Sequence, residues 1–588
     1  MRKKGNLSEL YFAGLSRLKE GCRFALPLIF SMSLFAGTCM NSTTFADEPV
    51  TQASSIYTAN EITDGNFADY SVYEYVNGTL TPKYFQVSIN TDYLNSKYSY
   101  VNWVSQNSGL KIGLPISDIY LGYSSDSKAG IRYEEVAENI LSLLFEGFSE
   151  DKGGAIYNAS SENFNIKSAF IQNTAISSGG ALFNIGYLGD VESIFIDNSS
   201  GENGGALFNK GSINNLNSDF EANYSVKGGA IFNDENSVIT NISGSFIGNY
   251  SKHNTDFVSG GAIYNLGELK LTNTSFIGNY AYSMGEKALG GAVYNEGNIT
   301  EITGVEFVKN YSRSTTLDGS GGAIHNIGII GEVVADFNNN YVLSVGAFGG
   351  AIYNGENAII KSVSGVFNNN SVSSAFSTDA ADALGGAIYN LGQITDGIKN
   401  SSFLGNYAIS TSDGKALGGA IYTNTDLRLV SDNYNSIFSG NYVQQSGQEK
   451  ENDAIYVNYE NDVNSVLTLS TLNNGSFVFD DNINGKNGYQ IKIQSADNTG
   501  SVQFNSLVKN ADVYFEGGHV EFTGQTFASS TVHLNGGTVS FAGKTPTTYT
   551  FYSLASDGNS PTKFEMNLDY NILTQNSSDY IRVIDTDS

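Results

Sequence analysis

Cysteine is nearly absent from this chain of 588 residues, and both copies, Cys22 and Cys39, fall within the first 46 residues. A chain exported without that segment would contain no disulfide, so its stability has to come from packing. Histidine is equally scarce. Its four copies, which show no spacing typical of metal ligands, are His253, His325, His519 and His533. We therefore expect no metal, no cofactor and no redox cysteine pair.

Long apolar runs are missing after residue 46, so we expect no membrane-spanning helix. The N-terminus does carry six basic residues and then an apolar run from Phe24 to Phe35, followed by a plausible cleavage site at Thr44-Phe45-Ala46. This arrangement predicts a signal peptide over residues 1–46 and hence an exported chain. Cys39 follows Thr38, which fits a lipoprotein site poorly.

Charged residues make up only 15% of the chain, and most of them are acidic. Without the predicted signal peptide, residues 1–46, the chain keeps 25 basic and 57 acidic residues, a net charge of −32. Such a balance argues against nucleic acid and against an anionic membrane surface as partners. It favours solubility of the exported chain over a specific cationic partner.

Glycine is abundant instead, with 65 copies, and much of it lies in a repeated word. Gly-Gly-Ala, an aliphatic residue, an aromatic residue (once His) and Asn (once Thr) recur ten times, from Gly153 to Gly418. A second word, Phe-x-x-Asn, also recurs ten times between Phe170 and Phe438. Self-similarity at a period of 24 to 36 residues indicates one supersecondary unit stacked many times.

The spacing divides each repeat into two arms. The fixed arm, from Gly-Gly to Phe, takes 16 to 18 residues in nine copies and 20 in the last. The variable arm, from Phe to the next Gly-Gly, takes 8 to 18 residues. Insertions in stacked repeats usually map to loops on one face, often the binding face. The variable loops begin after Asn249, Asn279, Asn310, Asn340, Asn370, Asn406 and Asn441.

Each repeat reads as short strands, because apolar residues alternate at period two, as in Leu269/Leu271, and Gly, Asn and Ser bound the segments. Three short strands in about 25 residues predict one coil of a single-stranded parallel β-helix. Equivalent residues then form columns, including two of Asn that can build amide ladders. Propeller blades are longer than these units, and a β-sandwich has no reason to repeat one sequence ten times. Asn-x-Gly turns, which tolerate left-handed backbone, follow in six copies: Asn184, Asn209, Asn265, Asn295, Asn326 and Asn390.

Two flanks surround the repeats of residues 145–458. Residues 47–144 contain neither word and predict an N-terminal cap, with a helix over residues 134–144 as one possibility. Residues 145–152 resemble a degenerate opening coil in which Phe148 replaces Asn, and residues 452–456 a decayed eleventh copy. Residues 459–588 alternate cleanly between Gly-rich turns, which predicts that the β-helix continues there with different coils.

The paired words over residues 145–458 resemble the repeats of the chlamydial polymorphic outer-membrane proteins, which are autotransporter-type surface proteins. Segments such as Leu534-Asn535-Gly536-Gly537 resemble, more weakly, the end of an autotransporter passenger. The resemblance implies a right-handed β-helix carried to the cell surface by a C-terminal outer-membrane β-barrel. No stretch up to Ser588 is long enough for that barrel, so we expect either a fragment or another mode of attachment.

Catalysis is the main competing function, since polysaccharide lyases and hydrolases also use parallel β-helices. The adjacent acids Asp480-Asp481 and Glu134-Glu135 point to opposite faces of a strand, so neither pair can flank one glycosidic bond. Acids contributed by different coils could do so. His325 occupies the aromatic column, where we expect it to stack. A calcium-binding nonapeptide array is not expected, because aliphatic residues and Asn stand where its Gly and Asp would be.

We expect partner contact on a surface, because no compact site is apparent. Tyrosines that follow Phe-x-x-Asn lie where the variable loops start, and such a line can bind by stacking with a polar tip or simply stabilise the column. The candidate contact residues are Tyr250, Tyr280, Tyr311, Tyr341, Tyr407 and Tyr442. The sequence thus predicts an exported, non-enzymatic β-helical adhesin or autotransporter passenger at the cell surface or outer membrane. Its partner would be a host or neighbour-cell protein or glycan; the alternatives are a polysaccharide-processing enzyme and a structural stalk.

Overall fold

The fold was analysed in a computed structural model of the chain, and every regular element that it describes is a β-strand. The described residues are 70–76, 79–85, 100–104, 111–115, 140–141, 144–159, 165–377, 379–458, 465–495, 499–522, 527, 529–541, 548–556, 560–566 and 580–583. The predicted signal peptide lies outside them, as does most of the predicted cap. Within these ranges there is no helix with the length and hydropathy needed to cross a membrane.

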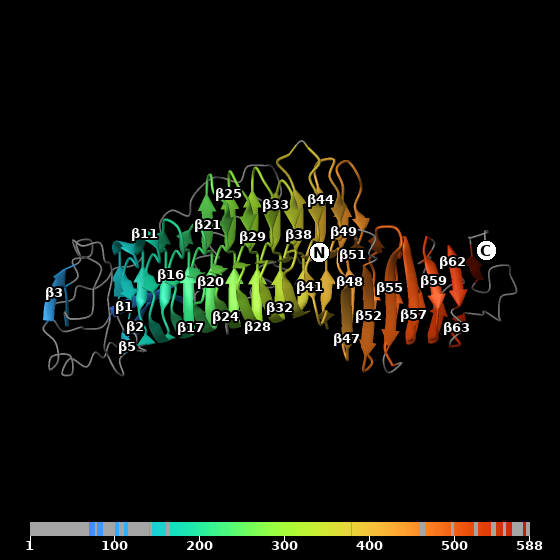
Figure 1. The fold of residues 1–588 in the computed structure, drawn as a ribbon, viewed down its shortest axis with the longest axis horizontal. Coiled ribbons are helices and arrows are strands. Elements are labelled where there is room, and N and C mark those ends of the chain that lie inside the picture. Colours follow the sequence, from blue (N-terminus) through green and yellow to red (C-terminus); the bar gives the residue numbers. More distant parts are fainter. Residues whose placement is uncertain are drawn as a thin grey trace, which may run out of the picture.

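The repeats wind into a parallel β-helix, a rod in which each coil adds one layer to three long faces (Figure 1). The predicted fold class is therefore confirmed, while the right-handed sense implied by the resemblance stays a prediction. Short antiparallel ribbons lie in the N-terminal flank: β1 (Tyr70–Val76) with β2 (Thr79–Phe85), and β3 (Tyr100–Val104) with β4 (Lys111–Pro115).

Ten of the twelve strands of sheet 1 come from the Gly-Gly-Ala words, whose aliphatic residue and Asn point into the rod while the aromatic residue points out. Its twelve strands are β8 (Ile156–Asn158), β12 (Leu182–Asn184), β16 (Leu207–Asn209), β19 (Ile231–Asn233), β23 (Ile263–Asn265), β27 (Val293–Asn295), β31 (Ile324–Asn326), β35 (Ile352–Asn354), β40 (Ile388–Asn390), β46 (Ile421–Thr423), β51 (Ile455–Val457) and β54 (Ile483–Gly485).

Sheet 2 holds the remainder of the fixed arm and ends on the repeated Phe. Within the repeats and their opening coil its strands are β5 (Ile140–Leu141), β6 (Leu144–Glu146), β9 (Asn165–Ile166), β10 (Ala169–Ile171), β13 (Tyr187–Val191), β14 (Ile194–Ile196), β17 (Ser212–Glu221), β20 (Val238–Ile247), β24 (Glu268–Ile277), β28 (Asn298–Val308), β32 (Ile329–Asn338), β36 (Ile359–Ser364), β37 (Val366–Asn368), β41 (Gln393–Ile394), β42 (Ile398–Lys399), β43 (Ser402–Leu404), β47 (Leu427–Asp432) and β48 (Asn435–Ser439).

The strands of sheet 3 within the repeats begin directly after the Asn of each Phe-x-x-Asn word. Its twelve strands are β7 (Ser149–Lys152), β11 (Thr174–Ser178), β15 (Ser199–Ser200), β18 (Tyr224–Ser225), β21 (Tyr250–His253), β25 (Tyr280–Ser283), β29 (Tyr311–Ser314), β33 (Tyr341–Ser344), β38 (Ser371–Ser374), β44 (Tyr407–Ser410), β49 (Tyr442–Gln444) and β50 (Glu451–Asn452). The last strand runs antiparallel to β49, so the chain folds back over that edge of the sheet.

The core is filled by columns, as the repeat words predicted. Between Phe145 and Phe438 successive Phe rings stack with centroids 4.6 to 5.0 Å apart, and all are buried. Each fully buried ring stabilises the fold by roughly 2–3 kcal/mol through apolar burial. Phe145 itself pairs with Phe170, so residues 144–152 do form an opening coil.

Two directional asparagine ladders satisfy the polar groups inside the turns. In the second ladder the Asn173 Nδ2 group donates to Asn198 Oδ1 (2.9 Å) and to the Phe145 carbonyl (3.0 Å), while the Asn173 backbone N–H donates to the same Oδ1 (3.0 Å). The pattern repeats through Asn441. The first ladder runs from Asn158 to Asn390 and ends on the hydroxyl of Thr423. Every rung therefore donates its side-chain amide to the coil that follows, and in the second ladder its backbone N–H as well.

The two glycines of each Gly-Gly word are needed for different reasons. The first has φ between +61° and +67° in all ten copies, a region costly for other residues. The second lies so close to the next coil that a Cβ would approach a carbonyl oxygen to between 1.9 and 2.4 Å; at Gly154 this is the Gly180 oxygen. Stacking itself thus excludes a side chain at the second position.

The left-handed turn residues are not where the sequence suggested. The six Asn-x-Gly turns, all of them described, do not have positive φ; close contact with the neighbouring coil explains the glycine in five of them, as at Gly297, whose Cβ would lie 2.3 Å from the Gly267 oxygen. The residue before each Asn of the second ladder is left-handed in all ten copies, with φ from +52° to +73°. Its backbone turns the corner from sheet 2 to sheet 3.

The helix considered for residues 134–144 is wrong at its C-terminal end. Ile140–Leu141 (β5) pairs with β9, and Leu144–Glu146 (β6) pairs with β10, because alternating apolar residues extend the sheet 2 columns by one layer. Residues 134–139 lie outside the described part of the chain.

Parallel strands continue beyond the repeats. The described residues between 465 and 566 form two parallel strand series that keep stacking on sheet 2 (Figure 1). Their strands are β52 (Val466–Leu472), β53 (Ser476–Phe479), β55 (Tyr489–Ser495), β56 (Ser501–Phe504), β57 (Ala511–Glu516), β58 (His519–Phe522), β59 (Thr531–Leu534), β60 (Thr538–Phe541), β62 (Ser553–Ser556) and β63 (Lys563–Met566). A final pair joins β61 (Thr548–Phe551) and β64 (Tyr580–Val583).

Six of the variable arms add a short sheet of their own, which we call the crest sheet. Its strands are β22 (Val258–Ser259), β26 (Ala288–Leu289), β30 (Gly319–Ser320), β34 (Ala347–Phe348), β39 (Ala383–Leu384) and β45 (Ala416–Leu417). Small apolar residues such as Val342, Val372 and Ala383 fill the space between crest sheet and sheet 3. The loops that connect the two sheets project from one side of the rod (Figure 1).

Candidate interaction surface

The six candidate tyrosines lie on the outer face of sheet 3, each directly after a ladder Asn. Tyr224, Tyr250, Tyr280, Tyr311 and Tyr341 stack with centroids 4.8 to 5.0 Å apart. Ser371 interrupts the column, and Tyr407 and Tyr442 then stack at 5.0 Å. The structure therefore brings the six together in two runs.

Stacking leaves these rings half-buried. Burial raises the pKa of Tyr250 to about 12 and raises that of Tyr280 and Tyr311 further, with neighbouring phenols adding to the effect. Neutral, stacked rings on one strand column stabilise the sheet, and their edges and hydroxyl groups are what a partner can reach. The contact role predicted for them stays a prediction.

A second outer column beside the tyrosines was missed from the sequence. Two residues after Tyr280, Tyr282 pairs in register with Lys252 on one side and Arg313 on the other. The Lys252 ammonium lies 5.3 Å and the Arg313 guanidinium 5.2 Å from the Tyr282 ring centroid. Phe376, from a loop two coils further on, lies 5.4 Å from the same guanidinium. The signal was present in the sequence as the i, i+2 spacing from the tyrosine column.

The loops at the crest expose large apolar side chains. Phe257, Leu317 and Phe376 are 40%, 38% and 49% exposed. Lys227 lies 4.4 Å from the Phe257 ring centroid. Aromatic residues and Arg are the residue types enriched at the centres of protein interfaces. The crest surface, which we define by Phe257, Tyr282, Arg313, Leu317 and Phe376, therefore has the chemistry of a partner contact.

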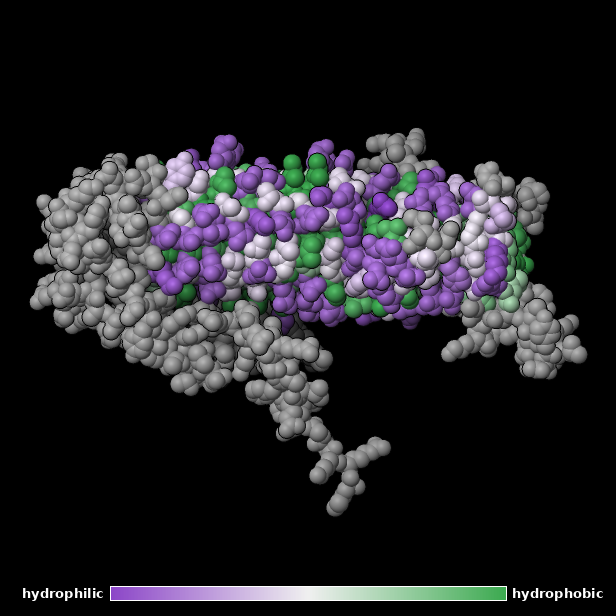
Figure 2. Space-filling model, turned by 90° about the horizontal axis from the view of Figure 1, so that it is seen from below, coloured by the Kyte–Doolittle hydropathy of each residue, from purple (hydrophilic) through white to green (hydrophobic). Residues whose placement is uncertain are grey.

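The opposite side of the rod differs. Figure 2 shows a mostly hydrophilic face on which apolar residues form small separate groups among the described atoms. Docking faces usually present a larger continuous apolar patch. This contrast favours the crest side for protein contact.

His325 stacks in the aromatic column of sheet 1, as expected. Its ring lies 5.1 Å from Tyr294 and 4.4 Å from Tyr353, and its Nδ1 is 2.8 Å from the Ser320 hydroxyl oxygen. Burial, assisted by the Lys287 charge, lowers the pKa of His325 to about 3. A neutral, stacked imidazole has a packing role.

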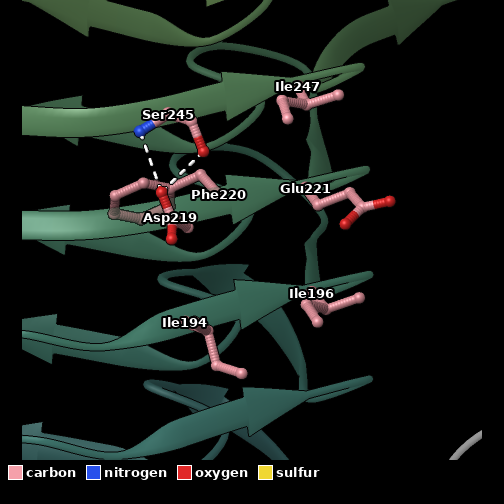
Figure 3. Close-up of a pocket in the computed structure, with 7 residues that line it drawn as sticks. All are labelled: Ile194, Ile196, Asp219, Phe220, Glu221, Ser245 and Ile247. Carbon is pink, nitrogen blue, oxygen red and sulfur yellow. Dashed lines mark hydrogen bonds between the residues drawn. The ribbon is translucent and has the colours of Figure 1, made fainter. Parts of the chain in front are cut away.

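Acids from one strand do share a face at Asp219 and Glu221. Burial, with the Asp219 charge adding, raises the pKa of Glu221 to about 7. Figure 3 shows Asp219 accepting hydrogen bonds from the Ser245 N–H (3.0 Å) and hydroxyl (2.6 Å), while Glu221 extends away from it. The cavity between them is about 10 Å³, room for roughly one water. A glycosidic bond does not fit there.

The adjacent carboxylates of Asp480 and Asp481 point in different directions, as expected. Asp481 is buried and accepts hydrogen bonds from Gly440 and Asn441, whereas Asp480 accepts one from Asn505 at the surface. Glu134 and Glu135 lie outside the described residues. In the described part of the chain no group of three or more His, Cys, Asp or Glu residues is placed to hold a metal ion.

Comparison with known protein families gives one match. Residues 192–210 match the Chlamydia polymorphic membrane protein repeat, and this segment contains both Phe195-x-x-Asn198 and the word that begins at Gly204. No curated protein and no solved structure matches the chain. The two words in the matched segment recur in ten copies, whose strands stack in register.

Proposed function

Because the chain carries the Chlamydia polymorphic membrane protein repeat, we propose that it is an exported β-helical rod at the cell surface that contacts a partner through its crest surface. It acts as an adhesin or autotransporter passenger and binds without catalytic turnover. The proposal is supported most by one observation: six consecutive variable arms leave the same side of the rod and build a shared sheet.

The chemistry of the crest surface supports a protein partner. The Arg313 guanidinium lies near the rings of both Tyr282 and Phe376, and such aromatic–cation groups often carry most of the energy of an interface. The rod supplies rigidity, because each coil is held by two ladders and a stacked Phe. A rigid support lowers the ordering cost of binding.

The test compares crest variants of the full chain. A triple variant, Tyr282→Ala/Arg313→Ala/Phe376→Ala, should lower binding of the labelled protein to cultured epithelial cells by about tenfold or more, since each interface centre is worth ~1–2 kcal/mol. Tyr187→Ala/Lys361→Ala on sheet 2, which removes an exposed Tyr and a cation elsewhere, serves as the matched control. Equal binding of both variants would contradict the crest as the contact.

Surface display is tested separately. Protease added to intact cells that produce the chain should cleave it, and an antibody against the crest loops should label those cells. A chain found only inside the outer membrane would overturn the proposed location. Incubation with plant and host glycans should release no product, whereas turnover would favour the polysaccharide-processing alternative.

A further inference from the structure

A trough lies at the turns between sheet 1 and sheet 2, and none of its lining residues belongs to the crest surface. Its volume is about 480 Å³, within the usual range for ligand sites. It is lined by Asn236, Ser237, Val238, Leu266, Gly267, Glu268, Glu296, Gly297, Asn298, Gly328 and Ile329, which come from four successive coils. The trough therefore runs along the axis of the rod.

The trough starts at one longer turn and runs across three shorter ones, and a second longer turn follows beyond its other end. At one end the turn Asp234–Ser237 is closed by Ser237 N–H donating to the Asp234 carbonyl (3.2 Å), with Asn236 at φ +60°. Beyond the other end Gly355–Ala358 repeats this geometry, with a 3.1 Å bond and Asn357 at φ +61°. The three coils between have two residues fewer in the turn. Four coil steps of roughly 4.8 Å separate the two longer turns by about 19 Å.

The floor of the trough is bare because stacking excludes side chains from it. A Cβ on Gly267, Gly297 or Gly328 would lie 2.3 to 2.4 Å from a carbonyl oxygen of the preceding turn. Side chains therefore stand only along the rims, where residues of successive coils repeat at the coil spacing. That spacing is close to the length of one sugar ring in a linear polysaccharide.

The rims carry complementary hydrogen-bonding groups. Glu268 Oε2 accepts from the Asn298 amide (3.2 Å), and Glu296 Oε2 accepts from the Tyr264 hydroxyl (3.4 Å). Each carboxylate keeps a second oxygen for a hydroxyl donor, and the amides of Asn236 and Asn298 offer donors to hydroxyl oxygens. Ile329, which is 50% exposed, adds an apolar contact for the C–H face of a sugar.

The negative charge along the trough excludes anionic glycans as ligands. Glu235, Glu268, Glu296 and Glu356 are all exposed along the trough or on the longer turns, in a chain of net charge −28. Sulfated, sialylated or uronate-rich glycans would be repelled. We propose that the trough binds a short segment of an uncharged, linear polysaccharide lying parallel to the rod axis.

The trough shares no lining residue with the crest surface, and its test measures glycan binding directly, without cell adhesion. The purified full chain is titrated by calorimetry with uncharged hexasaccharides: β-1,4-linked N-acetylglucosamine, cellohexaose and maltohexaose. A heparin hexasaccharide and a Lys-rich hexapeptide serve as charged probes. Saturable binding of at least one uncharged hexamer, with no binding of heparin, is expected.

A pair of variants assigns the binding to the trough. Glu268→Ala/Asn298→Ala should weaken it at least tenfold, whereas Glu202→Ala/Gln448→Ala, which removes the same charge and one amide at exposed positions outside the trough column, should leave it unchanged. All four side chains are at least partly exposed, so both variants should retain the parent circular dichroism spectrum. Absence of binding by every uncharged hexamer, equal affinity in both variants, or preference for either charged probe would overturn the proposal.

Discussion

The side-chain amide of Asn441 donates to the carboxylate of Asp481 at 2.8 Å, and this contact ends an asparagine ladder that begins at Asn173. Because each rung hands its donors to the next coil, the last coil needs an acceptor that has no donor of its own. A carboxylate meets that need: Asp481 accepts from the Asn441 side chain, the Asn441 N–H and the Gly440 N–H. Asp481 therefore joins the repeats to the C-terminal extension.

Removing that acceptor should weaken the junction. Asp481→Ala leaves the buried Asn441 donors without partners, and we expect a loss of about 1–3 kcal/mol in the free energy of unfolding, measured by urea titration. Asp481→Asn keeps an acceptor oxygen and should cost less. Asp480→Ala, at the surface, should change stability by less than about 0.5 kcal/mol; a cost equal to that of Asp481→Ala would contradict the role of the ladder.

Alanine variants of two glycines distinguish the stability cost of a left-handed backbone from the cost of a steric clash between coils. Gly440 has φ +73° and ordinary space around a Cβ, so Gly440→Ala should cost about 1–2 kcal/mol from conformation alone. Gly154→Ala would place a Cβ 2.2 Å from the Gly180 oxygen and should cost clearly more, because adjacent coils must move apart. Thermal unfolding of the two variants measures the order; a smaller loss for Gly154→Ala would contradict the stacking argument.

Asp453 should make stability fall as pH rises. Burial raises the pKa of Asp453 to about 8, while an unfolded Asp ionises near pH 4, so unfolding releases a proton between these values. The free energy of unfolding should therefore decrease from about pH 4 to about pH 8, and Asp453→Asn should remove this part of the slope. Urea titrations across that range, with the exposed Asp379→Asn as control, measure it. Parallel curves for the parent and Asp453→Asn would exclude Asp453 as the cause.

His325 should make the stability of the fold decrease as the pH falls, which is the opposite of the pH dependence expected from Asp453. Burial lowers the pKa of His325 to about 3, below the unfolded value near 6.5, so the unfolded chain binds an extra proton between them. Stability should fall as the pH drops through that window, and His325→Phe should lessen the fall. At pH 7 the variant should lose about 1 kcal/mol or less, because only the Ser320 hydroxyl loses a partner. Melting temperatures at pH 4 and pH 7 test the difference.

The repeat words alone determined the fold class, the two asparagine ladders, the Phe column and the stacking of His325. They could do so because every coil places the same residue at the same point, so one local pattern fixes contacts between distant parts of the chain. The helix considered near residue 140 was wrong, and the left-handed backbone lies before the second-ladder Asn, outside the Asn-x-Gly turns that would tolerate it. The neighbouring coil, rather than local preference, decides those backbones.

Only the tertiary structure decided how the variable arms are used. No shared word predicts that six arms of different length pair into the crest sheet, or that Arg313 and Phe376 meet there, because insertions break the repeat register. The same holds for the trough, whose bare floor and longer turns come from the order in which turns of different length are stacked. The roles of Asp453 and Asp481 were also decided by the tertiary structure. Coils on both sides bury these two carboxyl groups where the repeats meet the C-terminal extension, and nothing in the sequence distinguishes them from other acids.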